Sequence, residues 1–176
     1  MKLREFFSEL DQHHTRVPLD ELMRQLRKLE LHPDDVREFM HFNPERYQRN
    51  LVHEGPGYQA LLLCWRNGQR SPIHNHRGSS CGVRVVVGNA VETFFERNEA
   101  GFIFANGSRT LREGEICGSQ DDDMHQISNI QPAGRDLVTL HIYSPALLHM
   151  QVFSLDDNSI REFHDPIALL LDGAGI

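Results

Sequence analysis

Residues 68–88 read GQRSPIHNHRGSSCGVRVVVG, in which two histidines, one cysteine and two glycines are spaced as G-x5-H-x-H-x4-C-x6-G. The two histidines, His74 and His76, stand two positions apart in an apolar run that is bounded by turn residues. In a β-strand this spacing places both imidazoles on the same face. Histidine is the commonest metal ligand, and a β-barrel directs alternate side chains into its interior. The segment therefore predicts a β-barrel that binds a metal.

The length and charge of the chain limit the classes of protein that it can belong to. Its 176 residues, 39% of them hydrophobic, are enough for one globular domain with a sizeable core. We expect a single domain over 1–176, with a helical cap at 1–45 and a barrel at 46–170. A net charge of -7 and a pI near 5.8 argue against a nucleic acid or a membrane as partner, because both reward clustered lysine and arginine. The expected ligand is a small molecule.

The sequence predicts a cytoplasmic protein with reduced thiols. No window approaches the ~18 uninterrupted apolar residues that a membrane span needs, and the N-terminus lacks a long apolar core. Cys64, Cys81 and Cys117 are an odd number without a C-x-x-C spacing, which argues against a disulfide framework or a zinc knuckle. We expect a monomer or a weak homodimer.

Helical periodicity marks the first forty residues. Apolar residues recur at helical spacing from Leu19 to Leu29, with charged and polar residues on the opposite face, which predicts an amphipathic helix. A similar stripe over 3–10 predicts a shorter helix before it. Residues 33–40 begin with proline and two aspartates, as a third short helix would. We expect these helices to cap the barrel.

From about residue 58 the sequence changes to short apolar runs that are separated by turn residues. This texture is typical of an all-β sandwich or barrel, so we expect a mainly β, jelly-roll-like fold. The predicted strands lie at 59–65, 83–87, 91–95, 101–104 and 137–143, with one more around Ile116.

A third imidazole follows about fifty residues after the first two. His125 would complete a set of three neutral ligands, although the residues alone would allow His141 to compete for the third place. We expect the acidic residues 121–123, which precede His125, to form a solvated turn rather than a hard-cation site.

The combined spacing resembles the cupin superfamily, whose first motif is G-x5-H-x-H-x3,4-E-x6-G and whose second motif ends in H-x3-N. The matching positions are Gly68, His74, His76 and Gly88 in the first motif and His125 and Asn129 in the second. The proline and glycine of the second motif are not where that pattern expects them, and Cys81 stands where the first motif has its glutamate. The resemblance implies a cupin barrel with an all-histidine site that leaves coordination positions open for an anionic, bidentate substrate.

Between about residues 44 and 145 the chain resembles the cysteine dioxygenases. This cupin family uses non-haem iron and O2 to convert the thiol of L-cysteine to cysteine sulfinic acid. The matching segments follow the family's order and are 47–52, 63–65, 73–76, 80–81, 88–89, His125 and 140–145. The resemblance covers most of the predicted barrel.

The resemblance assigns a metal and a substrate to particular residues. It implies that His74, His76 and His125 bind one Fe(II) per chain, beside positions for the substrate thiolate, its amine and O2. Arg49 would hold the carboxylate of L-cysteine, and Tyr47 would be a second substrate contact.

The resemblance also implies a group of residues around the iron. Tyr143 would lie beside the iron and contact the substrate, and Cys81 would lie close enough to form the family's thioether link to that tyrosine. Thr139, His141 and Tyr143 share one face of a strand by period two and match the family's Ser-x-His-x-Tyr relay, in which the histidine orients the phenol. Threonine in place of serine keeps the hydroxyl group.

Rival functions stay open at this point. Dioxygenases of 3-mercaptopropionate and related thiols typically have glutamine where this chain has Arg49, so the arginine favours cysteine. A rival of another class is a metal-binding cupin without catalytic activity, or a zinc hydrolase that uses the same histidines. Cys81, His141 and Tyr143 argue against this second rival, because a plain binding site has no need of them.

Overall fold

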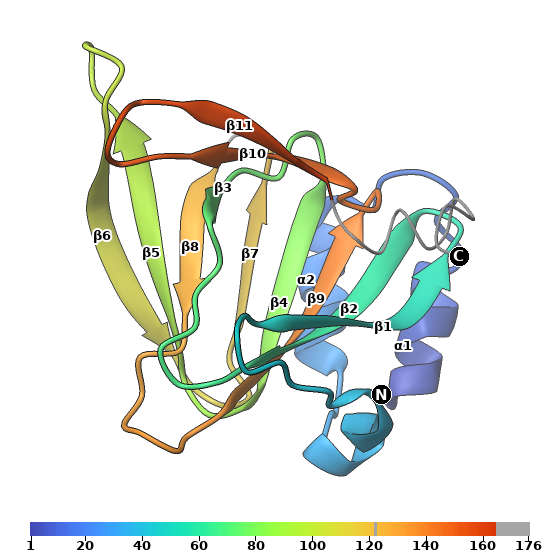
Figure 1. Cartoon of the computed structure of the whole chain (residues 1–176). Helices are drawn as coiled ribbons and strands as arrows, with labels where there is room; N and C mark the ends of the chain where they lie inside the picture. Colours follow the sequence, from blue (N-terminus) through green and yellow to red (C-terminus); the bar gives the residue numbers. More distant parts are fainter. Residues whose placement is uncertain (122, 165–176) are drawn as a thin grey trace, which may run out of the picture.

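Two antiparallel β-sheets face each other in the computed structural model, which describes residues 1–121 and 123–164 (Figure 1). The five-stranded sheet has the order β1-β2-β9-β4-β7, and the six-stranded sheet has the order β11-β10-β3-β8-β5-β6. The strands are β1 (Gln48–Gly55), β2 (Tyr58–Trp65), β3 (Ile73–His74), β4 (Ser80–Val87), β5 (Ala90–Arg97), β6 (Ile103–Leu111), β7 (Ile116–Gln120), β8 (Met124–Ser128), β9 (Leu137–Ser144), β10 (His149–Phe153) and β11 (Ile160–His164).

The fold is mainly β, as predicted, but the two sheets are not closed into a barrel. In the described part of the chain no ladder joins β6 to β7 or β1 to β11, so each sheet keeps two open edges. A cavity of about 680 Å³ lies beside β6 and β7 and is lined by Glu92, Ser119 and His125, among others. This cavity and its polar lining lie between β6 and β7, the two strands that would have to pair to close the barrel on this side.

The central strands of the five-stranded sheet are buried along their whole length. All residues of β2 and β9 are buried, which explains their almost continuous apolar sequences, because both faces of this part of the sheet are covered. Alternate side chains of β9 therefore point to opposite faces of the sheet. Leu140 and Ile142 belong to the apolar cluster on the helix side, whereas Tyr143 belongs to the cluster between the sheets. Period two therefore directs Thr139, His141 and Tyr143 toward the interior.

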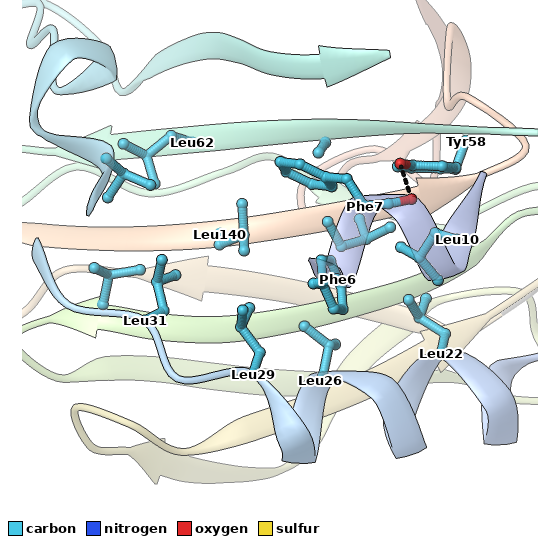
Figure 2. Close-up of a cluster of buried hydrophobic side chains, with 14 of the residues drawn as sticks. Phe6, Phe7, Leu10, Leu22, Leu26, Leu29, Leu31, Tyr58, Leu62 and Leu140 are labelled. Carbon is cyan, nitrogen blue, oxygen red and sulfur yellow. Dashed lines mark hydrogen bonds between the residues drawn. The ribbon is translucent and has the colours of Figure 1, made fainter. Parts of the chain in front are cut away.

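Three helices cover the outer face of the five-stranded sheet. They are α1 (Leu3–Leu10), α2 (Leu19–Lys28) and the 3-10 helix η1 (Pro33–Phe39), so the three predicted helices are present and the third is a 3-10 helix. Figure 2 shows the apolar stripes of α1 and α2 packed with Leu62 and Leu140 of the sheet. The helices thus cover the outer face of this sheet, and the space between the two sheets is lined by a different set of residues.

Glycines on the strands allow α2 to approach the sheet closely. A Cβ atom on Gly82 of β4 would lie 2.5 Å from Cδ1 of Leu26, and one on Gly118 of β7 would lie 2.7 Å from Sδ of Met23. Both distances are shorter than non-bonded carbon and sulfur atoms tolerate, so a larger residue at either position would force the side chains of α2 to shift. The packing of α2 depends on these two positions.

The predicted strands correspond to β2, β4, β5, β6, β7 and β9. The additional strands are β1, β3, β8, β10 and β11. β1 and β10 are only partly buried, β11 is mostly exposed, and β3 and β8 have two and five residues, so none of them shows a long apolar run. The division into a cap at 1–45 and a barrel at 46–170 stays a prediction, and its residues 165–170 lie outside the described part of the chain. Within that described part, each helix falls short of the length and apolarity that crossing a bilayer requires.

Candidate metal and substrate site

Three histidines meet between the two sheets. His74 of β3 pairs directly with His125 of β8, and His76 follows in the loop after β3. The ring centroids of His74 lie 5.4 Å from His76 and 4.7 Å from His125, and those of His76 and His125 are 4.7 Å apart. All three side chains are buried, and one nitrogen of each lies within 4.8 Å of the others. The three side chains could hold a metal ion.

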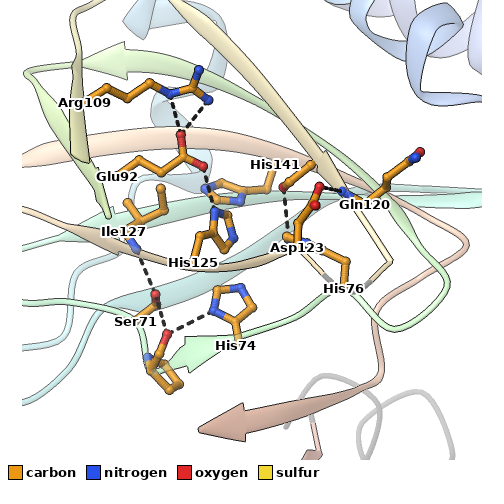
Figure 3. A network of polar contacts seen from close by, with 12 residues as sticks. Ser71, His74, His76, Glu92, Arg109, Gln120, Asp123, His125, Ile127 and His141 are labelled. Atoms are coloured by element: carbon orange, nitrogen blue, oxygen red, sulfur yellow. Dashed lines mark hydrogen bonds and ion pairs between the residues drawn. The ribbon is translucent and has the colours of Figure 1, made fainter. Parts of the chain in front are cut away.

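The outer nitrogens of two of these rings are fixed by hydrogen bonds (Figure 3). Nδ1 of His74 donates to the carbonyl oxygen of Pro72 at 3.0 Å, and Nδ1 of His125 donates to Oε1 of Glu92 at 2.7 Å. A neutral imidazole that donates through Nδ1 presents a lone pair on Nε2. His74 and His125 therefore each keep Nε2 as a metal ligand.

The third ring, His76, has a buried nitrogen without a hydrogen-bond partner. Its Nε2 lies 3.4 Å from Oγ of Ser119, whereas Nδ1 is buried and has no hydrogen-bond partner in the described part of the chain. A buried polar atom without a partner is costly. A metal ion in the cluster would give this ring the partner that it lacks.

Burial keeps the imidazoles of His74 and His76 neutral, as metal ligands must be. It lowers the pKa of His74 to about 3 and the pKa of His76 well below 6.5. Within the described residues no carboxylate belongs to the ligand group. Neutral imidazoles suit zinc, copper, iron and nickel, so the donor set fits a divalent transition metal rather than calcium or magnesium.

A chain of hydrogen bonds leads along β9 to Tyr143. Nε1 of Trp65 donates to Oγ1 of Thr139 at 3.0 Å, and this oxygen lies 2.9 Å from Nε2 of His141. Nδ1 of His141 lies 3.0 Å from the hydroxyl oxygen of Tyr143. Because the indole can only donate, the threonine hydroxyl is able to donate its own proton to Nε2 of His141. In that arrangement the neutral imidazole carries its proton on Nδ1, which donates a hydrogen bond to the hydroxyl oxygen of Tyr143.

Cys81 and Tyr143 are buried neighbours on adjacent strands. They are directly paired in the antiparallel ladder of β4 and β9 and belong to the same apolar cluster. Burial raises the pKa of both groups well above their ordinary values, which keeps the thiol and the phenol protonated. Tyr143 also stacks with His76 at a ring-centroid distance of 6.3 Å, so this pair lies next to the histidine cluster.

Arg49 and Tyr47 approach the same space from the start of the five-stranded sheet. The guanidinium carbon of Arg49, on β1, lies 5.5 Å from the ring centroid of Tyr143. After burial, the charge of Arg49 is the next largest cause of the lowered pKa of His141. Tyr47 stacks on Trp65 at 4.2 Å. A fixed cation therefore lies beside Tyr143 and close to the candidate metal site.

All the predicted site residues lie in or beside this one interior region, and two residues that the sequence did not indicate join them. Glu92 is the partner of His125, and Trp65 begins the hydrogen-bond chain to Tyr143. Glu92 gave no local signal, because its alternation with Val91 and Thr93 is that of an ordinary half-buried strand.

The acidic residues before His125 behave as predicted where they are described. Asp121 forms an exposed ion pair with Arg16, and Asp123 accepts a hydrogen bond from the backbone of Gln120. Asp122 lies outside the described residues. The carbonyl oxygen of Asp121 accepts a hydrogen bond from the backbone N–H of His76 at 2.9 Å, so the turn supports the loop that carries this histidine, while the described acidic side chains are not part of the ligand group.

The fold and the buried histidine cluster define a cupin with a candidate transition-metal site. A solved structure from Thermus thermophilus matches 63% of this chain and 94% of its own length, with a TM-score of 0.53 and 17% identity. A double-stranded β-helix protein from Klebsiella pneumoniae matches 62% of this chain and 81% of its own, with a TM-score of 0.52 and 18% identity. At these identities the likeness supports the fold alone.

The family follows from the sequence comparison. Residues 2–156 match the family model described as Cysteine dioxygenase type I, and the chain belongs to this family. Cysteine dioxygenase type 1 of Rattus norvegicus is 33% identical over 136 residues, which cover 73% of this chain and 66% of the rat protein. The protein of the same name from Danio rerio is 30% identical over 145 residues, 78% of this chain and 70% of its own. The match thus spans slightly less than two thirds of the rat relative.

Proposed function

We propose that this protein is a non-haem Fe(II) thiol dioxygenase that oxidises L-cysteine with O2 to cysteine sulfinic acid. The observation that carries the proposal is the meeting of three buried histidines, the Cys81–Tyr143 pair and the cation of Arg49 in one interior region. Membership of the cysteine dioxygenase family supports the same reaction. The reaction adds both atoms of one O2 molecule to the thiolate sulfur, so no further oxidant or reductant is needed.

His74, His76 and His125 are the residues that would hold the iron. Bound Fe(II) would supply coordination positions for a thiolate and O2 and the electrons that activate O2. Three neutral imidazoles leave the charge of a divalent ion uncompensated, because the described residues add no carboxylate to the group. The site therefore favours an anionic ligand, and a substrate thiolate meets that need.

Arg49 would bind the carboxylate of the substrate, with Tyr47 nearby. The guanidinium group is planar and presents two parallel N–H donors, which match both oxygens of a carboxylate. Such a charged hydrogen bond contributes roughly 1.5–3 kcal/mol. The position of Arg49 beside Tyr143 supports a substrate that extends from the metal site toward β1.

Tyr143 would place its hydroxyl group next to the bound substrate. His141 holds the phenol oxygen at 3.0 Å, and burial keeps the phenol protonated, so the hydroxyl can donate a hydrogen bond to the reacting groups. Thr139 fixes His141 from the other side. We further propose that the protein acts in the cytoplasm, as a monomer or weak homodimer.

Oxygen uptake by Fe(II)-loaded protein tests this proposal. L-cysteine, 3-mercaptopropionate and cysteamine are supplied in turn, and the products are analysed for sulfinates. Zinc-loaded protein is the matched control, because zinc occupies the same imidazoles without redox chemistry. We expect uptake with iron alone and the highest kcat/KM with L-cysteine. A preference for 3-mercaptopropionate would reassign the substrate, and no uptake with any thiol would contradict the dioxygenase.

A further inference from the structure

Glu92 is a buried carboxylate whose two oxygens bind partners with different roles. Oε1 accepts the hydrogen bond from Nδ1 of His125 at 2.7 Å. Oε2 accepts from Nε of Arg109 at 2.7 Å and lies 2.6 Å from a second guanidinium nitrogen of the same arginine. The side chain of Glu92 is only 1% exposed, whereas that of Arg109 is 44% exposed. Figure 3 shows the three residues in a line from the open side of the sheet to the histidine cluster.

Arg109 makes it possible for Glu92 to stay ionised in this position. Oε2 lies within hydrogen-bond distance of two guanidinium nitrogens of Arg109, and Oε1 accepts from His125, so the partners of both oxygens are N–H donors and the buried charge has a cation beside it. The acceptor that His125 meets is therefore an anion.

The candidate ligands are not equivalent in this respect. His74 donates its outer N–H to the neutral carbonyl group of Pro72, whereas His125 donates to the carboxylate. An anionic acceptor polarises the N–H bond more strongly and makes the opposite nitrogen a better donor to a metal. It also fixes the tautomer and the rotation of the ring.

Holding the strands together is not a sufficient reason for this arrangement. β5 and β8 already pair over five residues, with Glu92 opposite Ile127 and Phe94 opposite His125. A buried ion pair is often no more stabilising than apolar residues of similar volume. The hydrogen bond to His125 explains why a charged residue is buried here, whereas strand pairing alone does not.

We propose that Glu92, paired with Arg109, is a positioning residue that orients His125 and strengthens it as a metal ligand. This inference rests on the proposed metal site but does not depend on the reaction at that site. The same pair would act on any divalent metal that the histidines bind.

The test is metal affinity in the absence of thiol and O2. Glu92→Gln keeps the shape of the side chain and removes its charge, and Glu96→Gln is the matched control, because Glu96 is an exposed residue of the same strand. Cobalt and zinc affinities are measured by competition with a chelator, and the visible absorption spectrum of the cobalt form reports its ligand field. We expect the affinity of Glu92→Gln to fall by about 10–100-fold with an altered cobalt spectrum, and Glu96→Gln to match the wild type.

A double variant controls for the unpaired charge that the single substitution leaves behind. Glu92→Gln alone leaves Arg109 without its anion, whereas Glu92→Gln with Arg109→Gln removes both charges together. Circular dichroism confirms that each variant is folded, and the double variant is expected to show the same loss of affinity. Wild-type affinity and spectrum in a folded variant would overturn the inference. Loss of affinity in a protein that oxidises no thiol would support it and contradict only the dioxygenase, while a wild type that binds neither metal would overturn both proposals.

Discussion

Cys81 lies directly opposite Tyr143 in the ladder between β4 and β9. Directly opposed residues in an antiparallel pair have Cβ atoms about 4.5–5.5 Å apart, within reach of a bond between a cysteine sulfur and a tyrosine ring. Both side chains are buried, and Tyr143 stacks with His76, so the pair lies beside the site where O2 would be activated.

We predict that a thioether forms between Cys81 and Tyr143 during turnover. The new bond joins Sγ to the ring carbon beside the phenol oxygen, and O2 accepts the two electrons and two protons that leave. The intact mass of iron-loaded protein should fall by two hydrogen atoms after exposure to L-cysteine and O2. Cys117→Ala, which removes another buried thiol, should retain this change, and Cys81→Ala should lose it. An unchanged mass in the wild type would contradict the prediction.

Replacing Arg49 by glutamine should weaken binding of substrates that carry a carboxylate. The lost charged hydrogen bond is expected to raise the KM for L-cysteine by about 10–100-fold. The KM for cysteamine, which has no carboxylate, should change little. Arg46→Gln is the control, because Arg46 is exposed and near in sequence. Equal effects of Arg49→Gln on both substrates would remove Arg49 from the carboxylate site.

The stability of the metal-free protein should fall as the pH falls below 6.5. Burial lowers the pKa of His141 well below 6.5 in the folded state, so below that pH the unfolded chain binds a proton that the folded chain does not. Each such proton steepens the dependence of the unfolding free energy on pH by up to about 1.4 kcal/mol per pH unit. Urea unfolding of chelator-treated protein should show a shallower dependence for His141→Gln, and identical slopes for wild type and variant would count against a buried neutral His141.

Adding a side chain at Gly82 is expected to destabilise the packing of α2 on β4. A Cβ atom there would lie 2.5 Å from Cδ1 of Leu26 and 3.0 Å from Cγ of Leu22, so Gly82→Ala must shift these buried side chains of α2 and should destabilise the protein by about 1–3 kcal/mol. Gly107→Ala on β6 is the control, because the nearest atom to its Cβ would be 4.0 Å away, in ordinary contact. Denaturant unfolding measures both. Equal stability of the two variants would contradict a requirement for glycine at position 82.

Local patterns were enough to predict much of the site. The two-residue period of a strand predicted one face for His74 and His76, and the structure brings their rings together with His125, but β3 ends at His74 and His76 reaches the cluster from the loop that follows. The same period placed Thr139, His141 and Tyr143 on one face, and hydrogen bonds connect them. These predictions concern residues that are close in the sequence or that belong to a known motif.

Contacts between distant strands could not be predicted in this way. Glu92 meets His125 because β5 and β8 are neighbours in the six-stranded sheet, and Trp65 meets Thr139 across β2 and β9. Neither contact leaves a signal in the local sequence. The open edges of β6 and β7 also depend on how the two sheets are placed, which apolar periodicity does not specify.

The incorporation of labelled oxygen tests the central claim most directly. Iron-loaded protein is given L-cysteine under 18O2 in ordinary water, and the product is analysed by mass spectrometry. We predict cysteine sulfinate that carries two labelled oxygen atoms, formed in proportion to the O2 consumed. Cystine with hydrogen peroxide, or a sulfinate whose oxygen comes from water, would contradict the proposed reaction.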